Sequence, residues 1–127
     1  MKVLVIVEDD LQMQLLIRMN IELDDRLELS GAATNAAEAI EVARAEQPDL
    51  IILDHFIDGD VMGLHAAPAL KEAAPSAKVL LFTSHDLRLE ARREPAIDRY
   101  LGKTDITALL GTVQEMLDLD PPVASGR

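Results

Sequence analysis

Short strand-like segments, several of them unbroken apolar runs, alternate with helix-like segments along the whole chain, and this alternation limits the fold more than any other feature. Residues 3–7 are five consecutive apolar residues, four of them β-branched, which is typical of a strand covered on both faces. Further strands are predicted at residues 27–33, 49–53, 78–83 and 97–101. Strands that alternate with helices form a parallel sheet with helices on both faces, so the sequence predicts a doubly wound α/β fold.

The segments between these runs carry helical signals. Helices are predicted at residues 11–23, 36–46, 64–73, 86–93 and 105–119. The first can be capped by Asp10, and Leu11, Leu15, Met19 and Leu23 give it an apolar stripe at a spacing of four residues. We therefore expect this stripe to face the sheet.

The other helices have their own start and stop signals. Thr34 or Asn35 can cap the second, and Pro48 ends it. Pro68 is expected to kink the third helix or to delay its start. In the last helix, the residues predicted to point inward are Ile106, Leu109, Leu110, Val113 and Leu117.

Length, cysteine content and charge exclude several classes of protein. A chain of 127 residues is one domain that buries roughly two-thirds of its unfolded surface. We expect residues 1–119 to be this domain, and residues 120–127, which follow Leu119 and contain two prolines, to be a flexible tail or the start of a linker.

The absence of Cys excludes disulfides and thiolate metal sites. With no signal peptide and no apolar run of spanning length, a cytoplasmic protein without a membrane partner is expected. The net charge of −11 argues against direct binding to nucleic acid.

Polar residues with chemical potential follow four of the predicted strands. The first strand is followed by Glu8, Asp9 and Asp10, and the third by Asp54. The fourth strand ends at Thr83, and Lys103 comes after the fifth. The carboxyl ends of parallel strands lie at one edge of the sheet, where doubly wound folds place their functional groups. We therefore expect these side chains to converge.

These residues resemble the receiver domain of two-component response regulators. The motifs that carry the resemblance are Val-Glu-Asp-Asp at residues 7–10, Asp54, Thr83-Ser84, and Tyr-Leu-Gly-Lys at residues 100–103. The resemblance spans about residues 2–119 and implies a flavodoxin-like (βα)5 fold with strand order 2-1-3-4-5. It also implies a sensor histidine kinase or a histidine phosphotransfer protein as the phosphoryl donor.

Carboxylates that end neighbouring strands repel each other, at a cost of several kcal/mol in a site of low dielectric constant. A hard divalent cation removes this repulsion, and oxygen ligands without nearby His or Cys favour Mg²⁺. The resemblance assigns Asp9 and Asp54 as direct ligands, the Phe56 backbone carbonyl as a third, and Glu8 as a ligand through water. Alternatively, Glu8, Asp9 and Asp10 only stabilise the start of the first helix. That alternative suits Asp10 better than Asp9, because Asp54 needs a countercharge.

Asp54 is the predicted phosphoryl acceptor, since a carboxylate beside a cation can attack phosphorus to give an acyl phosphate. Lys103 and Thr83 are expected to stabilise the phosphoryl oxygens through the ammonium and the hydroxyl. The resemblance implies a switch in which Thr83 shifts and the ring of Tyr100 turns inward. Alternatively, Asp54 only begins a turn, and Tyr100 is a half-buried ring with a solvated hydroxyl.

Two further positions are expected to tune the lifetime of the acyl phosphate. Phe56 and His85 lie two residues beyond Asp54 and Thr83, where the resemblance places residues that control the access of water. A bulky ring hinders water, so slow self-dephosphorylation is predicted. His85 either positions water or is an exposed residue at the start of a helix.

The predicted fourth helix and fifth strand form the least acidic region. Residues 84–103 carry a net charge of +1, whereas the rest of the chain carries −12. We predict an output surface there for a downstream protein target, or for a homodimer, through Arg88, Arg92, Arg93 and Arg99. The alternative is a solvated helix with ion pairs along its own surface.

Three classes of function remain open from the sequence. The leading hypothesis is a phosphorylation-activated response regulator receiver, with no enzymatic output of its own, that acts as a stand-alone domain through protein contacts. The second is a Mg²⁺-dependent phosphohydrolase with Asp54 as nucleophile, for which a second acid two residues later is usual, yet Phe56 stands there. The third is a degenerate receiver that binds partners without phosphorylation.

Overall fold

The structure is a computed structural model that describes residues 1–6, 11–54 and 63–119. Within these residues, five strands form one parallel sheet in the order β2-β1-β3-β4-β5. The strands are β1 (Lys2–Ile6), β2 (Glu28–Ala33), β3 (Leu50–Leu53), β4 (Lys78–Thr83) and β5 (Arg99–Gly102). The predicted fold class and strand order are confirmed.

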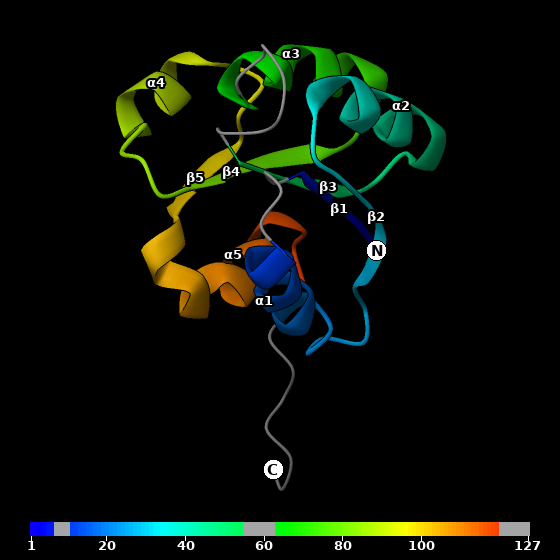
Figure 1. Ribbon diagram of the computed structural model, residues 1–127, viewed down its shortest axis with the longest axis vertical. Helices are drawn as coiled ribbons and strands as arrows, with labels where there is room; N and C mark the ends of the chain where they lie inside the picture. The colour runs from blue at the N-terminus through cyan, green and yellow to red at the C-terminus, as the bar shows by residue number, and fades with distance from the viewer. Residues whose placement is uncertain (7–10, 55–62, 120–127) are drawn as a thin grey trace, which may run out of the picture.

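The helices lie on both faces of the sheet. They are α1 (Leu11–Ile21), α2 (Ala36–Glu46), α3 (Gly63–Ala73), α4 (Arg88–Arg93) and α5 (Leu109–Met116), with a 3-10 helix, η1 (Lys103–Ala108), before α5. Figure 1 shows α1 and α5 on one face and α2, α3 and α4 on the other. In the described ranges, no helix has the length and apolar character needed to cross a membrane.

The central strand β3 joins the two halves of the core. Its four residues are fully buried, as the apolar run predicted. Leu50 and Ile52 pack with the residues of α1 and α5, whereas Ile51 and Leu53 pack with those of α2 and α3. Side chains alternate between the two faces of a strand, so both faces of β3 must be apolar.

The prediction that the apolar stripe of the first helix faces the sheet is wrong. Leu11, Leu15, Met19 and Leu23 are 74%, 57%, 56% and 73% exposed, and the buried residues of α1 are Ile17 and Ile21. The helix therefore has two apolar faces, and spacing alone does not distinguish them. The face with Ile17 and Ile21 packs beside β1, β3 and α5.

Three predicted helix starts also differ from the structure. Helix α3 begins at Gly63 and continues through Pro68, so its start is not delayed. Helix α4 begins at Arg88 rather than Asp86. Helix α5 begins at Leu109 and follows η1, in which Asp105, at φ −100° and ψ 43°, departs from helical geometry.

The ends of α2 and the inward face of α5 follow the prediction. The side-chain oxygen of Asn35 accepts a hydrogen bond from the Glu38 N–H at 2.9 Å, and the helix ends in left-handed Gln47, just before Pro48. In and after α5, Leu109, Val113 and Leu117 are buried, and Ile106 and Leu110 are partly buried.

A buried carboxylate that the sequence did not indicate ties the end of α1 to α5. Asp24 is 3% exposed, and its carboxylate accepts hydrogen bonds from the Arg26 Nε at 2.9 Å and from the Gln114 Nε2 at 2.9 Å. The hydrogen bonds from Arg26, followed by that from Gln114, hold the pKa of Asp24 well below its usual value, although burial opposes this shift.

We expect Asp24→Ala to lower the free energy of unfolding by about 2–3 kcal/mol, because it leaves the buried Gln114 amide without its acceptor. The folded-state pKa of Asp24 is depressed, so its contribution is complete above an unfolded-state pKa of about 3.9 and declines as the pH falls below it. Urea denaturation at pH 7 and pH 3 should show a smaller difference between wild type and variant at pH 3. Asp25→Ala, at an exposed neighbour, is the control; an equal loss there would contradict the assignment.

Candidate functional site

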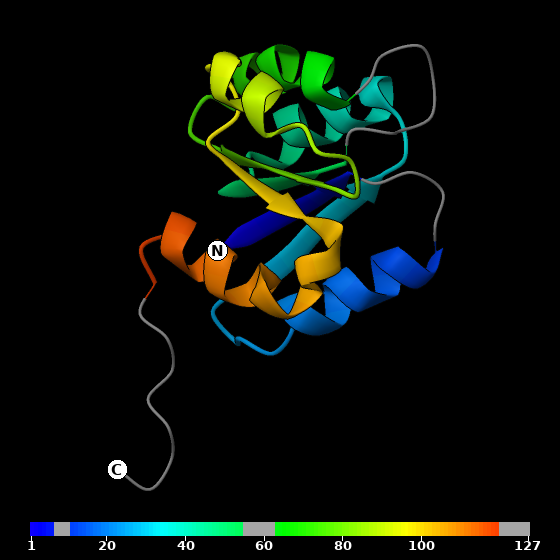
Figure 2. The same ribbon diagram turned by 90° about the vertical axis from the view of Figure 1, so that its left-hand side faces the viewer.

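The structure places the polar ends of three strands at one edge of the sheet. The five strands run in the same direction, so their carboxyl ends share an edge (Figure 2). Leu53 pairs with both Ile6 and Leu81, which puts Asp54 one residue beyond the ends of both pairings. Thr83 pairs with Gly102, the residue before Lys103. Asp54, Thr83 and Lys103 therefore lie on adjacent strand ends, as the sequence predicted.

A buried ion pair joins Asp54 to Lys103. The Lys103 Nζ donates to the Asp54 Oδ2 at 2.5 Å, and the two side chains are 12% and 2% exposed. Removing a carboxylate from water is costly unless an opposite charge and hydrogen bonds compensate. The ammonium supplies that compensation, and it holds one carboxylate oxygen in a fixed position at the carboxyl edge of β3.

Thr83 and Tyr100 are linked through the backbone of one residue. Thr83 is 1% exposed, and its hydroxyl accepts a hydrogen bond from the His85 N–H at 3.4 Å. The Tyr100 hydroxyl donates to the His85 carbonyl at 2.7 Å. The sequence indicated only a side-chain role for His85. It carries no signal for this contact, because any residue can supply a backbone N–H and carbonyl.

The remaining residues of the predicted magnesium site lie outside the described residues. These are Glu8, Asp9 and Phe56. Within the described part of the chain, no three His, Cys, Asp or Glu side chains are grouped so that they could hold a metal. Asp54 is the one predicted ligand whose surroundings the structure describes, so the Mg²⁺ site stays a prediction.

The predicted output surface has a pattern of ion pairs different from that expected along one helix. The exposed pair Arg88 and Asp86 is joined by hydrogen bonds of 3.0 Å, which lower the pKa of Asp86 and raise that of Arg88. Arg99 pairs with Glu115 at 2.8 Å, from β5 to α5. Arg92 and Arg93 are exposed on α4. The predicted output surface thus contains four arginines, of which Arg88 and Arg99 form ion pairs.

The sequence matches the response regulator receiver domain family over residues 4–114. Response regulator protein VraR of Staphylococcus aureus (strain NCTC 8325 / PS 47) is 31% identical over 100 residues, which are 77% of this chain and 47% of VraR. A putative transcriptional regulator of Pseudomonas aeruginosa is 39% identical over 83 residues, or 65% of this chain and 39% of that protein. The chain therefore spans about half the length of the curated relatives it matches, or less.

Solved structures share the fold. The response regulator domain of Thermotoga maritima CheB superposes with a TM-score of 0.79 at 20% identity, over 95% of this chain and 98% of that one. A LuxR-family response regulator from Aurantimonas sp. SI85-9A1 gives a TM-score of 0.82 at 22% identity, over 92% and 84%. At these identities the likeness concerns the fold alone.

We expect Lys103→Met to lower the free energy of unfolding by about 3 kcal/mol, because it leaves the buried Asp54 carboxylate without the ammonium. The double variant Asp54→Asn/Lys103→Met should lose less than the sum of the two single changes. Urea denaturation of the four proteins measures this coupling. Arg88→Met, which breaks an exposed pair, is the matched control and should have a smaller effect. Additive single changes would show that the pair is not coupled.

Proposed function

This chain belongs to the response regulator receiver domain family of two-component signalling, and from that membership we propose that it accepts a phosphoryl group on Asp54. The observation that carries the proposal is the buried Asp54 carboxylate at the carboxyl edge of the sheet, bonded to Lys103. The proposed donor is a phosphorylated histidine of a sensor kinase or a phosphotransfer protein, and the proposed location is the cytoplasm.

In the proposed reaction, a carboxylate oxygen of Asp54 attacks phosphorus while the bond from phosphorus to the histidine nitrogen breaks. The product is an acyl phosphate, and the electron pair of the broken bond stays on the histidine ring. The Lys103 ammonium, already 2.5 Å from Asp54 Oδ2, pairs with the phosphoryl oxygens that appear beside it. The Thr83 hydroxyl, on the neighbouring strand end, donates to another of these oxygens.

We propose that Mg²⁺ is held by Asp9, Asp54, the Phe56 carbonyl and, through water, Glu8. Bound there, Mg²⁺ would offset the charge of the carboxylates and of the incoming phosphoryl group. Pairing of Ile6 with Leu53 supports this assignment, because the chain leaves β1 next to Asp54. The roles of Glu8, Asp9 and Phe56 rest on the sequence.

The proposed switch uses the link between Thr83 and Tyr100. A Thr83 hydroxyl that turns to a phosphoryl oxygen gives up the 3.4 Å contact with the His85 N–H. The His85 carbonyl holds the Tyr100 hydroxyl, so movement of this backbone changes the position of the ring. The surface that would respond contains Arg88, Arg92, Arg93 and Arg99. We propose that a downstream protein, or a second copy through α4 and β5, reads this change.

Exposure to acetyl phosphate and Mg²⁺ should add the mass of one phosphoryl group to the wild type and none to Asp54→Ala. Asp86→Ala, at an exposed aspartate that pairs with Arg88 and not with Lys103, is the control and should be phosphorylated like the wild type. Intact-protein mass spectrometry gives the readout. Phosphoryl uptake that persists in Asp54→Ala would contradict Asp54 as the acceptor. Turnover of a small phosphate ester would instead indicate a phosphohydrolase. Absence of phosphoryl uptake by the wild type would indicate a degenerate receiver.

Phe56→Asn should shorten the lifetime of the acyl phosphate, because a smaller polar side chain gives water better access to phosphorus. The decay of the phosphorylated form after removal of the donor, followed by mass spectrometry, measures this lifetime. Leu89→Asn, at an exposed position on α4, is the control. An unchanged or longer lifetime would contradict the role of Phe56, and His85→Ala tests in the same way whether His85 takes part.

A further inference from the structure

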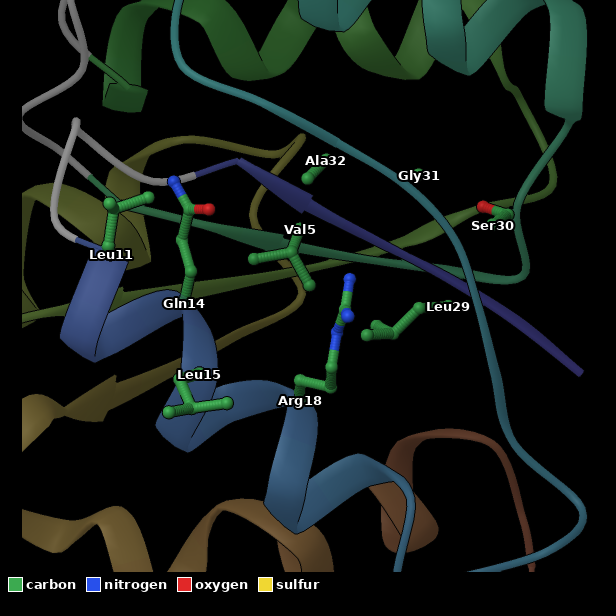
Figure 3. A pocket seen from close by; sticks show the side chains of 9 residues that line it. All are labelled: Val5, Leu11, Gln14, Leu15, Arg18, Leu29, Ser30, Gly31 and Ala32. Atoms are coloured by element: carbon green, nitrogen blue, oxygen red, sulfur yellow. The ribbon is translucent and has the colours of Figure 1, made fainter.

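The two edge strands of the sheet are held in register to different degrees. Strand β2 lies at one edge and strand β5 at the other, and within the described residues each pairs with a single strand. The register of β2 on β1 is interrupted by one extra residue, Ser30, between Leu29 and Gly31. These three residues line a cavity of about 360 Å³ between β2 and α1 (Figure 3). Such an irregular edge is compatible with the site, because β2 carries none of the proposed site residues.

Strand β5 has to keep its register, because Lys103 follows it directly. The strand has four residues, Arg99–Gly102, and all of them are at least partly exposed, so apolar burial fixes its position less than that of the fully buried β3. Gly102 nevertheless lies opposite the end of β4, and the Lys103 ammonium reaches Asp54. A slip of one residue turns every side chain of a strand to the other face of the sheet, which would take Lys103 away from Asp54.

Asp98, the residue before β5, holds the start of that strand to the start of β4. Its backbone N–H donates to the Val79 carbonyl at 2.9 Å, and its carboxylate oxygen Oδ2 accepts from the Val79 N–H at 2.8 Å. Val79 is fully buried, so its N–H needs an acceptor from the protein. Two hydrogen bonds to the backbone of the same residue leave only one register of β5 on β4 in which both can form.

Lys71, from the last turn of α3, completes this contact. The Lys71 Nζ donates to the Asp98 Oδ2 at 2.6 Å and to the Ala77 carbonyl at 2.7 Å. The Lys71 and Asp98 side chains are 30% and 35% exposed, so the ion pair itself contributes little to stability. The ammonium instead orients the carboxylate, because it binds the same oxygen that accepts from the Val79 N–H.

We propose that Asp98 is a positioning residue for the ion pair between Asp54 and Lys103. It fixes the register of β5 on β4 at the amino end of the strand, and thereby the place of the Lys103 ammonium at the carboxyl end. A strand rises about 3.3 Å per residue, so Asp98 is far from the reacting groups and acts only through the backbone of β5. The inference rests on the proposed function in so far as this ammonium serves phosphoryl transfer to Asp54.

Asp49 provides a matched control, because it makes the same two contacts at a strand that packing also holds. Its backbone N–H donates to the Lys2 carbonyl at 2.8 Å, and its carboxylate accepts from the Lys2 N–H at 2.8 Å. Strand β3, which follows Asp49, is fully buried and pairs with both β1 and β4. Asp49→Ala should therefore lower the stability of the protein and leave the pair between Asp54 and Lys103 in place.

The coupling between Asp54 and Lys103 in urea denaturation shows whether the pair is in place. In Asp98→Ala this coupling should be lost, so that Asp54→Asn and Lys103→Met become nearly additive. Asp98→Asn should retain it, because an amide oxygen can still accept from the Val79 N–H, and so should Asp49→Ala. Circular dichroism checks folding, and Lys71→Met, which should reduce the coupling in part, replaces Asp98→Ala if that variant does not fold. Unchanged coupling in the variant used, or an equal loss in Asp49→Ala, would overturn the proposal.

The rate of phosphoryl uptake from acetyl phosphate separates this inference from the proposed function. Asp98→Ala should take up the phosphoryl group roughly tenfold more slowly than the wild type, because a displaced Lys103 no longer meets the phosphoryl oxygens. Asp98→Asn and Asp49→Ala should react at close to the wild-type rate. If the wild type takes up no phosphoryl group, the proposed function fails, whereas the urea measurement still tests the position of Lys103. Uptake by Asp98→Ala at the wild-type rate would overturn the positioning role.

Discussion

The ion pair between Asp54 and Lys103 is the interaction on which the site depends. A carboxylate that is 2% exposed needs a nearby cation, and here the cation comes from the end of β5, two strands away from β3. The pair can form only if β3, β4 and β5 keep their register, because each strand fixes where its neighbour ends. The register of the sheet therefore determines whether the Asp54 carboxylate and the Lys103 ammonium can meet. Any group that binds to Asp54 must share or displace the ammonium.

A second constraint connects this buried pair to the surface. The Thr83 hydroxyl is buried and Tyr100 is half-buried, and both bind the backbone of His85. Two hydrogen bonds to one residue make the segment after β4 sensitive to both hydroxyls. The 3.4 Å contact at Thr83 is longer than the usual range, so it is the weaker of the two. A movement of the Thr83 side chain therefore breaks this contact more readily than a movement of Tyr100 breaks its 2.7 Å bond.

The sequence predicted the parts of the structure that follow from short-range pattern. The apolar run of β3, the strand-end positions of Asp54 and Lys103, and the cap at Asn35 each follow from a few adjacent residues. It failed where a distant contact decides. Helix α1 has two apolar faces, and the packing of α5 selects the one with Ile17. Likewise, Asp24 is buried because Gln114, 90 residues away, donates to it.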